Sequence, residues 1–171
     1  KFQLTAALNP CKCGYYPDRK KCTCSQGQIK NYLGRISKPL LDRIDIFTET
    51  IILKYGEISN SDKGENSYNV RKRIEKVHHI QKERYKNDGI LFNSELSAGM
   101  IKRYCVMDNE AKEYLENIFE NMEFSARAYH KVLKTARTIA DMDESGEIKR
   151  KHISEAVCYR TADKKYWGVT M

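Results

Sequence analysis

The pattern of apolar and polar positions changes once along the chain, from strand-like runs to helical periodicity. Residues 2–8 form an apolar run that stops at Asn9-Pro10, and residues 45–53 form a second run rich in β-branched and aromatic side chains. Runs of this length bounded by turn residues are typical of buried strands. Serines that precede short apolar patterns between the runs favour two short helices there. The first third of the chain therefore predicts two strands separated by short helices.

Helical periodicity dominates after residue 66. Residues 56–66 carry few bulky apolar side chains and are interpreted as a linker. Beyond them, apolar residues recur at three- and four-residue spacing behind candidate capping residues. This pattern predicts five helices: from Ser67 to about Lys86, from Ser97 to near Cys105, from Asp108 to Met122, from Ser125 to about Met142, and from about Lys151 to Thr161. We expect a helical domain over 67–162 and a short tail over 163–171.

Composition and charge narrow the class of protein. The chain has 171 residues, which is enough for one domain with a small appendage. No apolar run approaches the roughly 18 residues of a membrane span, and nothing resembles a secretory signal, so we expect a cytoplasmic protein with no membrane partner. The net charge of +8 suits a polyanionic partner. The sequence contains no G-x-x-x-x-G-K-[ST] loop, so this chain is not expected to hold a nucleotide in that way by itself.

Four cysteines lie close together near the start of the chain. Cys11 and Cys13 form one C-x-C pair, and Cys22 and Cys24 form a second after a short polar loop. If the loop folds back, the two pairs offer the four thiolates that a closed structural Zn²⁺ site accepts. Two disulfides between the pairs and four unpaired thiols are the alternatives. A reducing intracellular environment favours the metal, so the prediction is a structural zinc site.

The cysteine loop and the segment after it are basic and aromatic. Between residues 11 and 39 seven lysines and arginines face a single acid, Asp18, and three tyrosines are interleaved with them. Cations beside flat rings suit phosphate neutralisation and base stacking on single strands. Part of this charge can instead offset the negative charge of four thiolates around zinc. The candidate nucleic-acid contacts are Lys12, Lys20, Lys21 and Lys30.

Several unusual strings occur together in this chain. Residues 4–15, which contain the first C-x-C pair, residues 34–46, residues 96–97 and residues 125–130 closely resemble the magnesium-chelatase-like AAA+ ATPases of the ComM (YifB) type. The resemblance runs from the start to about residue 160. It implies a mainly α fold, in which the C-terminal strands of an AAA+ α/β core with a four-cysteine zinc insertion are followed by a helical lid. Both Walker motifs are missing, so the resemblance implies the C-terminal portion of a longer protein, inactive alone.

The resemblance divides the chain into four parts. It places the end of the AAA+ core, with its zinc-binding loop at 11–24, over residues 1–55, and the linker over 56–66. The helical lid then covers 67–162 and the tail 163–171. Within the tail, the single tryptophan, Trp167, can dock on the core or on a neighbouring subunit.

The resemblance also assigns three residues to nucleotide chemistry. Asn9 matches the sensor-1 position, Arg43 matches the arginine finger donated to a neighbouring subunit, and Arg127 matches the ATP-contacting sensor-2 position. The alternatives are a turn-stabilising Asn9, an Arg43 paired with a nearby acid, and a solvated Arg127. The sensor-2 role has a physical motive, because an arginine near free backbone N–H groups at a helix start suits a phosphate. Arg137, lower on the same helix, is interpreted as surface or interface charge.

What the resemblance implies for the intact protein is an ATP-dependent DNA motor. It would bind ATP and Mg²⁺ between the subunits of a ring, expected to be a hexamer. Its associated activity is helicase or branch-migration work on DNA during natural transformation. Two other functions stay open: the ATPase subunit of a magnesium chelatase, and a non-catalytic zinc module that binds nucleic acid or protein.

Overall fold

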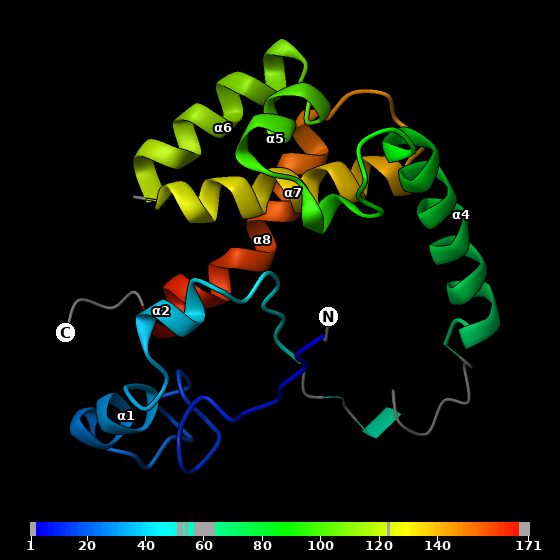
Figure 1. The fold of residues 1–171 in the computed structure, drawn as a ribbon. Helices are drawn as coiled ribbons and strands as arrows, with labels where there is room; N and C mark the ends of the chain where they lie inside the picture. The colour runs from blue at the N-terminus through cyan, green and yellow to red at the C-terminus, as the bar shows by residue number, and fades with distance from the viewer. Residues whose placement is uncertain (1–2, 51–52, 54, 57–63, 123, 168–171) are drawn as a thin grey trace. The chain divides into compact units, whose positions relative to one another are not determined.

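The computed structural model describes residues 3–50, 53, 55–56, 64–122 and 124–167, and the described chain is mainly helical (Figure 1). Its helices are α1 (Gln26–Leu33), α2 (Lys38–Leu41), α4 (Ser67–Tyr85), η1 (Asn93–Glu95), α5 (Ala98–Tyr104), α6 (Asn109–Met122), α7 (Ala126–Met142) and α8 (Arg150–Trp167). Among the described residues, no helix combines the length and apolar character needed to cross a membrane.

The chain divides into two compact units. Residues 1–47 and 161–171 form the first, here named the cysteine unit. Residues 48–160 form the second, here named the helical unit. Helix α8 begins in the helical unit and ends in the cysteine unit.

Helix α7 provides the centre of the helical unit. Its residues Val132, Leu133, Ala136 and Ala140 are buried and recur at three- and four-residue spacing, as a helix that packs on several sides requires. Side chains from α5, α6 and α8 complete the same core. The core also contains Ile148, fully buried, whose segment makes an isolated parallel bridge with Met107.

Capping side chains begin most of these helices where the sequence predicts them. The hydroxyl of Ser125 accepts a hydrogen bond from the Ala128 N–H at 3.1 Å at the start of α7, and Ser97 caps α5 in the same way. Helix α4 differs by one residue, since Asn66 is its cap and Ser67 its first residue. Helix α8 continues to Trp167, beyond the predicted end at Thr161.

The interpretation of Arg137 as surface charge is wrong. This side chain is 1% exposed, and its guanidinium donates to Asp141 and to the carbonyls of Ser145 and Gly146. Arg84 donates to the same carboxylate from α4. Burial lowers the pKa of Arg137, but the Asp141 carboxylate opposes that shift. The network joins α4, α7 and the turn after α7 inside the helical unit, so its role is structural.

The two predicted strands are not formed in the described residues. Residues 3–9 and 44–50 have no regular secondary structure, and no ladder pairs them with another segment there. An isolated strand leaves its backbone N–H and C=O groups without strand partners, so an apolar run becomes a strand only beside a neighbour. The sequence pattern of these runs is real, but the pairing that would turn it into a sheet is not present in this part of the structure.

Candidate metal centre

The four predicted metal ligands come together in the cysteine unit. The sulfur atoms of Cys11, Cys13, Cys22 and Cys24 all lie within 4.8 Å of one another. Three of the separations are 3.3, 3.8 and 3.5 Å, for the pairs 11–13, 11–22 and 13–22. A tetrahedral Zn²⁺ with Zn–S bonds of about 2.3 Å holds its sulfurs about 3.8 Å apart. The donor set therefore fits zinc, and the separations exceed the ~2.05 Å of a disulfide bond.

Local turns of the chain bring the two cysteine pairs together. Gly14 follows the first pair with φ at +84°, a conformation that suits glycine, and its N–H bonds to the Cys11 carbonyl at 3.1 Å. The Asp18 carbonyl accepts the N–H of Cys22 at 2.8 Å and turns the chain back. Ser25 then starts α1 with a capping box that uses Gln28. The second pair is thus fixed between a turn and a helix start.

The thiols of this cluster differ in acidity. A hydrogen bond from the Tyr15 backbone N–H and another from the Cys11 thiol lower the pKa of Cys13 to about 5. Burial and the neighbouring sulfurs raise the pKa of Cys22 to about 11. Adjacent thiols cannot all ionise without a cation, because each thiolate repels the next. A divalent metal removes this conflict, since it binds the thiolate form and displaces the remaining protons.

Aromatic side chains from the end of α8 pack on this cluster. Cys11, Ile29 and Leu33 are buried, and Tyr166 and Trp167 lie among the half-buried side chains around them. The Trp167 indole N–H donates to the Leu33 carbonyl at 3.0 Å, at the C-terminal end of α1, where carbonyls lack helical partners. The sequence allowed Trp167 to dock either on the core or on a neighbouring subunit. In the structure it packs on the core of its own unit.

The predicted nucleotide residues have separate surroundings. Asn9 and Arg43 are exposed residues of the cysteine unit, and the Arg43 guanidinium donates to the Pro39 carbonyl at 2.7 Å. Arg127 is exposed in the first turn of α7, in the helical unit, next to the cap made by Ser125. Each side chain is accessible to a ligand.

Charge is distributed unequally between the two units. The cysteine unit carries eleven lysines and arginines against four acids, a net charge of +7, and the helical unit carries twenty against nineteen, a net charge of +1. All four predicted nucleic-acid contacts are exposed in the cysteine unit: Lys12, Lys20, Lys21 and Lys30. The basic character of the chain therefore belongs almost entirely to the unit that holds the cysteine cluster.

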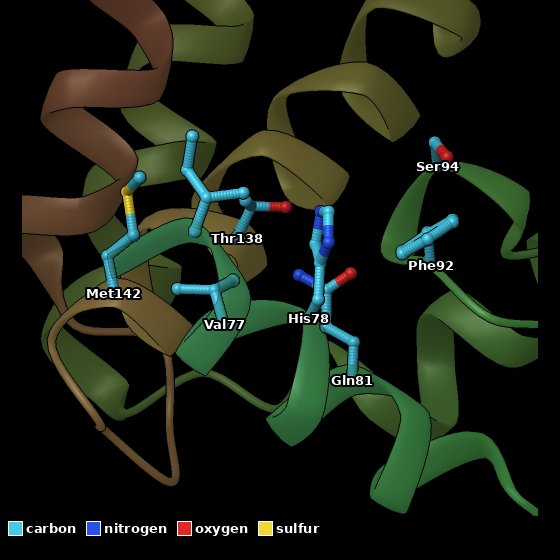
Figure 2. A pocket seen from close by; sticks show the side chains of 8 residues that line it. Val77, His78, Gln81, Phe92, Ser94, Thr138 and Met142 are labelled. Carbon is cyan, nitrogen blue, oxygen red and sulfur yellow. The ribbon is translucent and has the colours of Figure 1, made fainter. Parts of the chain in front are cut away.

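The helical unit contains a groove of about 310 Å³ that sequence reasoning missed. Figure 2 shows its lining, which comes from α4, from the segment around η1 and from α7: Ile74, Val77, His78, Gln81, Phe92, Ser94, Thr138 and Met142. The rings of His78 and Phe92 lie 4.8 Å apart. No local motif marks this groove, because three segments distant in sequence build it.

Comparison with known families matches both parts of the chain. The family model described as magnesium chelatase, subunit ChlI C-terminal, matches residues 64–160. The model described as magnesium chelatase, subunit ChlI, matches residues 1–58. Together the two matches cover both regions that the sequence separates by a linker.

Known proteins similar to this chain are longer than it is. The chain is 39% identical over 161 residues to competence protein ComM of Haemophilus influenzae. This match covers 94% of the present chain and 31% of that protein. It is 38% identical over 165 residues to the uncharacterized protein YifB of Salmonella typhimurium, covering 96% and 32%. An uncharacterized protein of Mycobacterium tuberculosis is 31% identical over 142 residues, covering 83% and 28%. The chain spans about a third of the length of these curated relatives.

Proposed function

The chain belongs to the magnesium-chelatase-like family of the ComM type, and on that premise we propose that it is the C-terminal part of an AAA+ ATPase that acts on DNA. The name of one relative, competence protein ComM, supports a motor that works as a helicase or in branch migration during natural transformation. In this proposal residues 1–55 end the ATPase core, 56–66 link it to a lid over 67–162, and 163–171 form a tail.

The observation that carries the proposal is the combination of four convergent thiols and a net charge of +7 in one unit. Zinc held by Cys11, Cys13, Cys22 and Cys24 would fix the basic loop between them and contribute folding energy to a unit with few buried apolar side chains. Even with two negative charges remaining on the zinc and its four thiolates, the unit keeps a strong positive charge. Such a surface attracts the phosphate backbone of a nucleic acid whatever its base sequence.

Lys12, Lys20, Lys21 and Lys30 are the proposed DNA contacts. Their side chains are exposed, and three of them belong to the loop that the metal would order. Lysine contacts to phosphates release counterions, so affinity is expected to fall steeply with salt. A porphyrin substrate offers no comparable reason for this charge, which supports DNA over the magnesium-chelatase alternative.

ATP with Mg²⁺ is proposed to bind between subunits of a ring, expected to be a hexamer. Asn9 would orient the attacking water, Arg43 would reach the nucleotide of the adjacent subunit, and Arg127 would contact its phosphates. Two guanidinium groups neutralise the charge that spreads over the γ-phosphoryl oxygens in the transition state. The Walker residues would come from the rest of the full-length protein, so the present chain alone is expected to hydrolyse no ATP.

The test is ATP hydrolysis by the full-length protein carrying Arg43→Ala or Arg127→Ala. We expect a loss of about 10³-fold for Arg43→Ala, as for other arginine fingers, and a smaller loss for Arg127→Ala. Arg71→Ala is the matched control, because Arg71 is an exposed arginine of α4 with no proposed role. Wild-type hydrolysis by both variants with intact rings would exclude the two residues from the active site and leave the non-catalytic zinc module as the better account. Insertion of Mg²⁺ into a porphyrin by the full-length protein would instead favour the chelatase.

A further inference from the structure

Two neighbouring rings, each with a cation over it, lie on the cysteine unit, and they combine the cysteine loop with the end of α8. The rings of Tyr16 and Tyr166 meet edge to face with centroids 6.0 Å apart. The Arg19 guanidinium lies over the Tyr16 ring at 5.1 Å, and the Lys165 ammonium lies over the Tyr166 ring at 5.2 Å. Both cations are exposed, and both tyrosines are half-buried. We name these four residues the aromatic row.

We propose that the aromatic row, Arg19, Tyr16, Tyr166 and Lys165, is a binding site for single-stranded nucleic acid. The inference rests on the proposed function, since it deepens the DNA contact assigned to the cysteine loop. It adds a second segment, the last turn of α8, that no loop motif identifies. The site is complete only when the loop and the end of α8 are packed together.

The chemistry of the row suits unpaired bases. Guanidinium planes and aromatic rings both stack on nucleobases, so an arginine over a tyrosine ring brings two groups that can contact an unpaired base. A cation over a ring also keeps its full charge, so Arg19 and Lys165 remain able to neutralise phosphates. Two rings with a cation over each therefore combine base stacking with phosphate contact, the two interactions by which proteins bind single strands. The base faces of duplex DNA are covered by base stacking, so a duplex can use only the phosphate contacts of the row.

The row is held in place from both sides, which lowers the entropy lost on binding. On the loop side, the Tyr16 backbone N–H contacts the Cys11 sulfur at 3.5 Å, so the proposed metal ligand positions the first ring. On the helix side, Trp167 follows Tyr166 directly and is fixed by its hydrogen bond to the Leu33 carbonyl. The nearest acid in sequence, Asp18, accepts the Lys20 backbone N–H at 3.0 Å. The unit's charge of +7 excludes a basic ligand.

The experiment measures binding of a fluorescently labelled oligo-dT strand to the full-length protein over a series of salt concentrations. The double variant Arg19→Ala/Lys165→Ala is expected to reduce the slope of log K against log salt by about 1.4, from two lost phosphate contacts. Tyr166→Leu keeps apolar bulk but removes the ring and is expected to weaken binding about tenfold, whereas Tyr166→Phe keeps wild-type affinity. Lys112→Ala, on α6 of the helical unit, is the matched charge control and is expected to change nothing. Metal content and tryptophan emission verify that each variant is folded.

Three results overturn the proposal. In the first, Arg19→Ala/Lys165→Ala and Tyr166→Leu bind oligo-dT like wild type, while a variant with alanine at Lys12, Lys20, Lys21 and Lys30 does not. The DNA contact then lies outside the aromatic row, and the proposed function survives without it. If the variants lose duplex and single-strand binding equally, the row senses charge and not bases. If poly-glutamate displaces the strand from wild type and the row variants weaken both ligands alike, the surface takes an acidic peptide. ATP hydrolysis, measured in parallel, reports on the motor separately.

Discussion

Removal of the metal is expected to release Trp167 from the cysteine unit. The cluster that holds it buries only three side chains in the described residues, Cys11, Ile29 and Leu33. Full burial of Ile29 and Leu33 contributes about 3–6 kcal/mol. Ordering the fourteen backbone residues from Cys11 to Cys24 costs about 14–28 kcal/mol. Apolar burial alone therefore cannot hold the loop.

A structural zinc would offset this difference. In small zinc-finger peptides, metal binding coupled to folding is favourable by about 10–16 kcal/mol, a net value that already includes the cost of ordering the chain. The helical unit has its own core around α7 and does not use the cysteine cluster. Loss of metal should thus unfold the loop and free the end of α8 while the helices of the helical unit persist.

The assay follows tryptophan emission while a mercurial reagent or a strong chelator removes the metal. Trp167 is the single tryptophan of the chain, so the signal reports this contact alone. We expect about one zinc per chain, a red shift of the emission on its release, and far-UV circular dichroism that stays largely helical. Cys13→Ser should reproduce the shifted emission without any reagent, and Cys158→Ser, outside the cluster, should not. Unchanged emission after complete metal release, or a purified chain that binds no metal, would refute the reasoning.

Two further predictions concern the helical unit. Burial raises the pKa of the Cys105 thiol to about 11, so at pH 8 this thiol should react with a thiol reagent only after unfolding. The exposed Cys158 should react at once. Fast reaction of two thiols in the metal-loaded native chain would contradict the buried position of Cys105. Asp141→Ala leaves two arginines without their carboxylate and is expected to lower the free energy of unfolding by about 3–5 kcal/mol in a urea titration. Glu144→Ala, which removes an exposed ion pair with Lys76, is the control and should cost less than about 1 kcal/mol, so similar costs for the two variants would contradict a buried network.

Local patterns predicted those parts of the molecule that local interactions determine. Helix starts at Ser97 and Ser125 follow from capping, and the grouping of four sulfurs follows from two C-x-C pairs on a short loop. In the part of the chain that the structure describes, the predicted strands are not formed, because strand pairing depends on neighbours that a sequence pattern does not contain. The apolar runs alone could not supply that information.

Long-range contacts were out of reach for the same reason. Arg137 looks like a helix-surface cation in sequence, but its partners, the turn carbonyls and the Asp141 carboxylate that Arg84 also uses, are chosen by tertiary packing. Tyr166 was equally hidden, because the Tyr16 ring that it meets lies 150 residues earlier in the chain. Only the folded structure shows that the last turn of α8 packs in the cysteine unit.

The proposed DNA-dependent motor can be tested by the rate of ATP hydrolysis of the full-length protein with and without single-stranded DNA. We expect DNA to increase the rate, and we expect Cys13→Ser, which disrupts the loop with the proposed DNA contacts, to abolish the increase but leave the basal rate in place. A basal rate that DNA does not change, in a protein with its metal bound, would exclude a DNA-dependent motor.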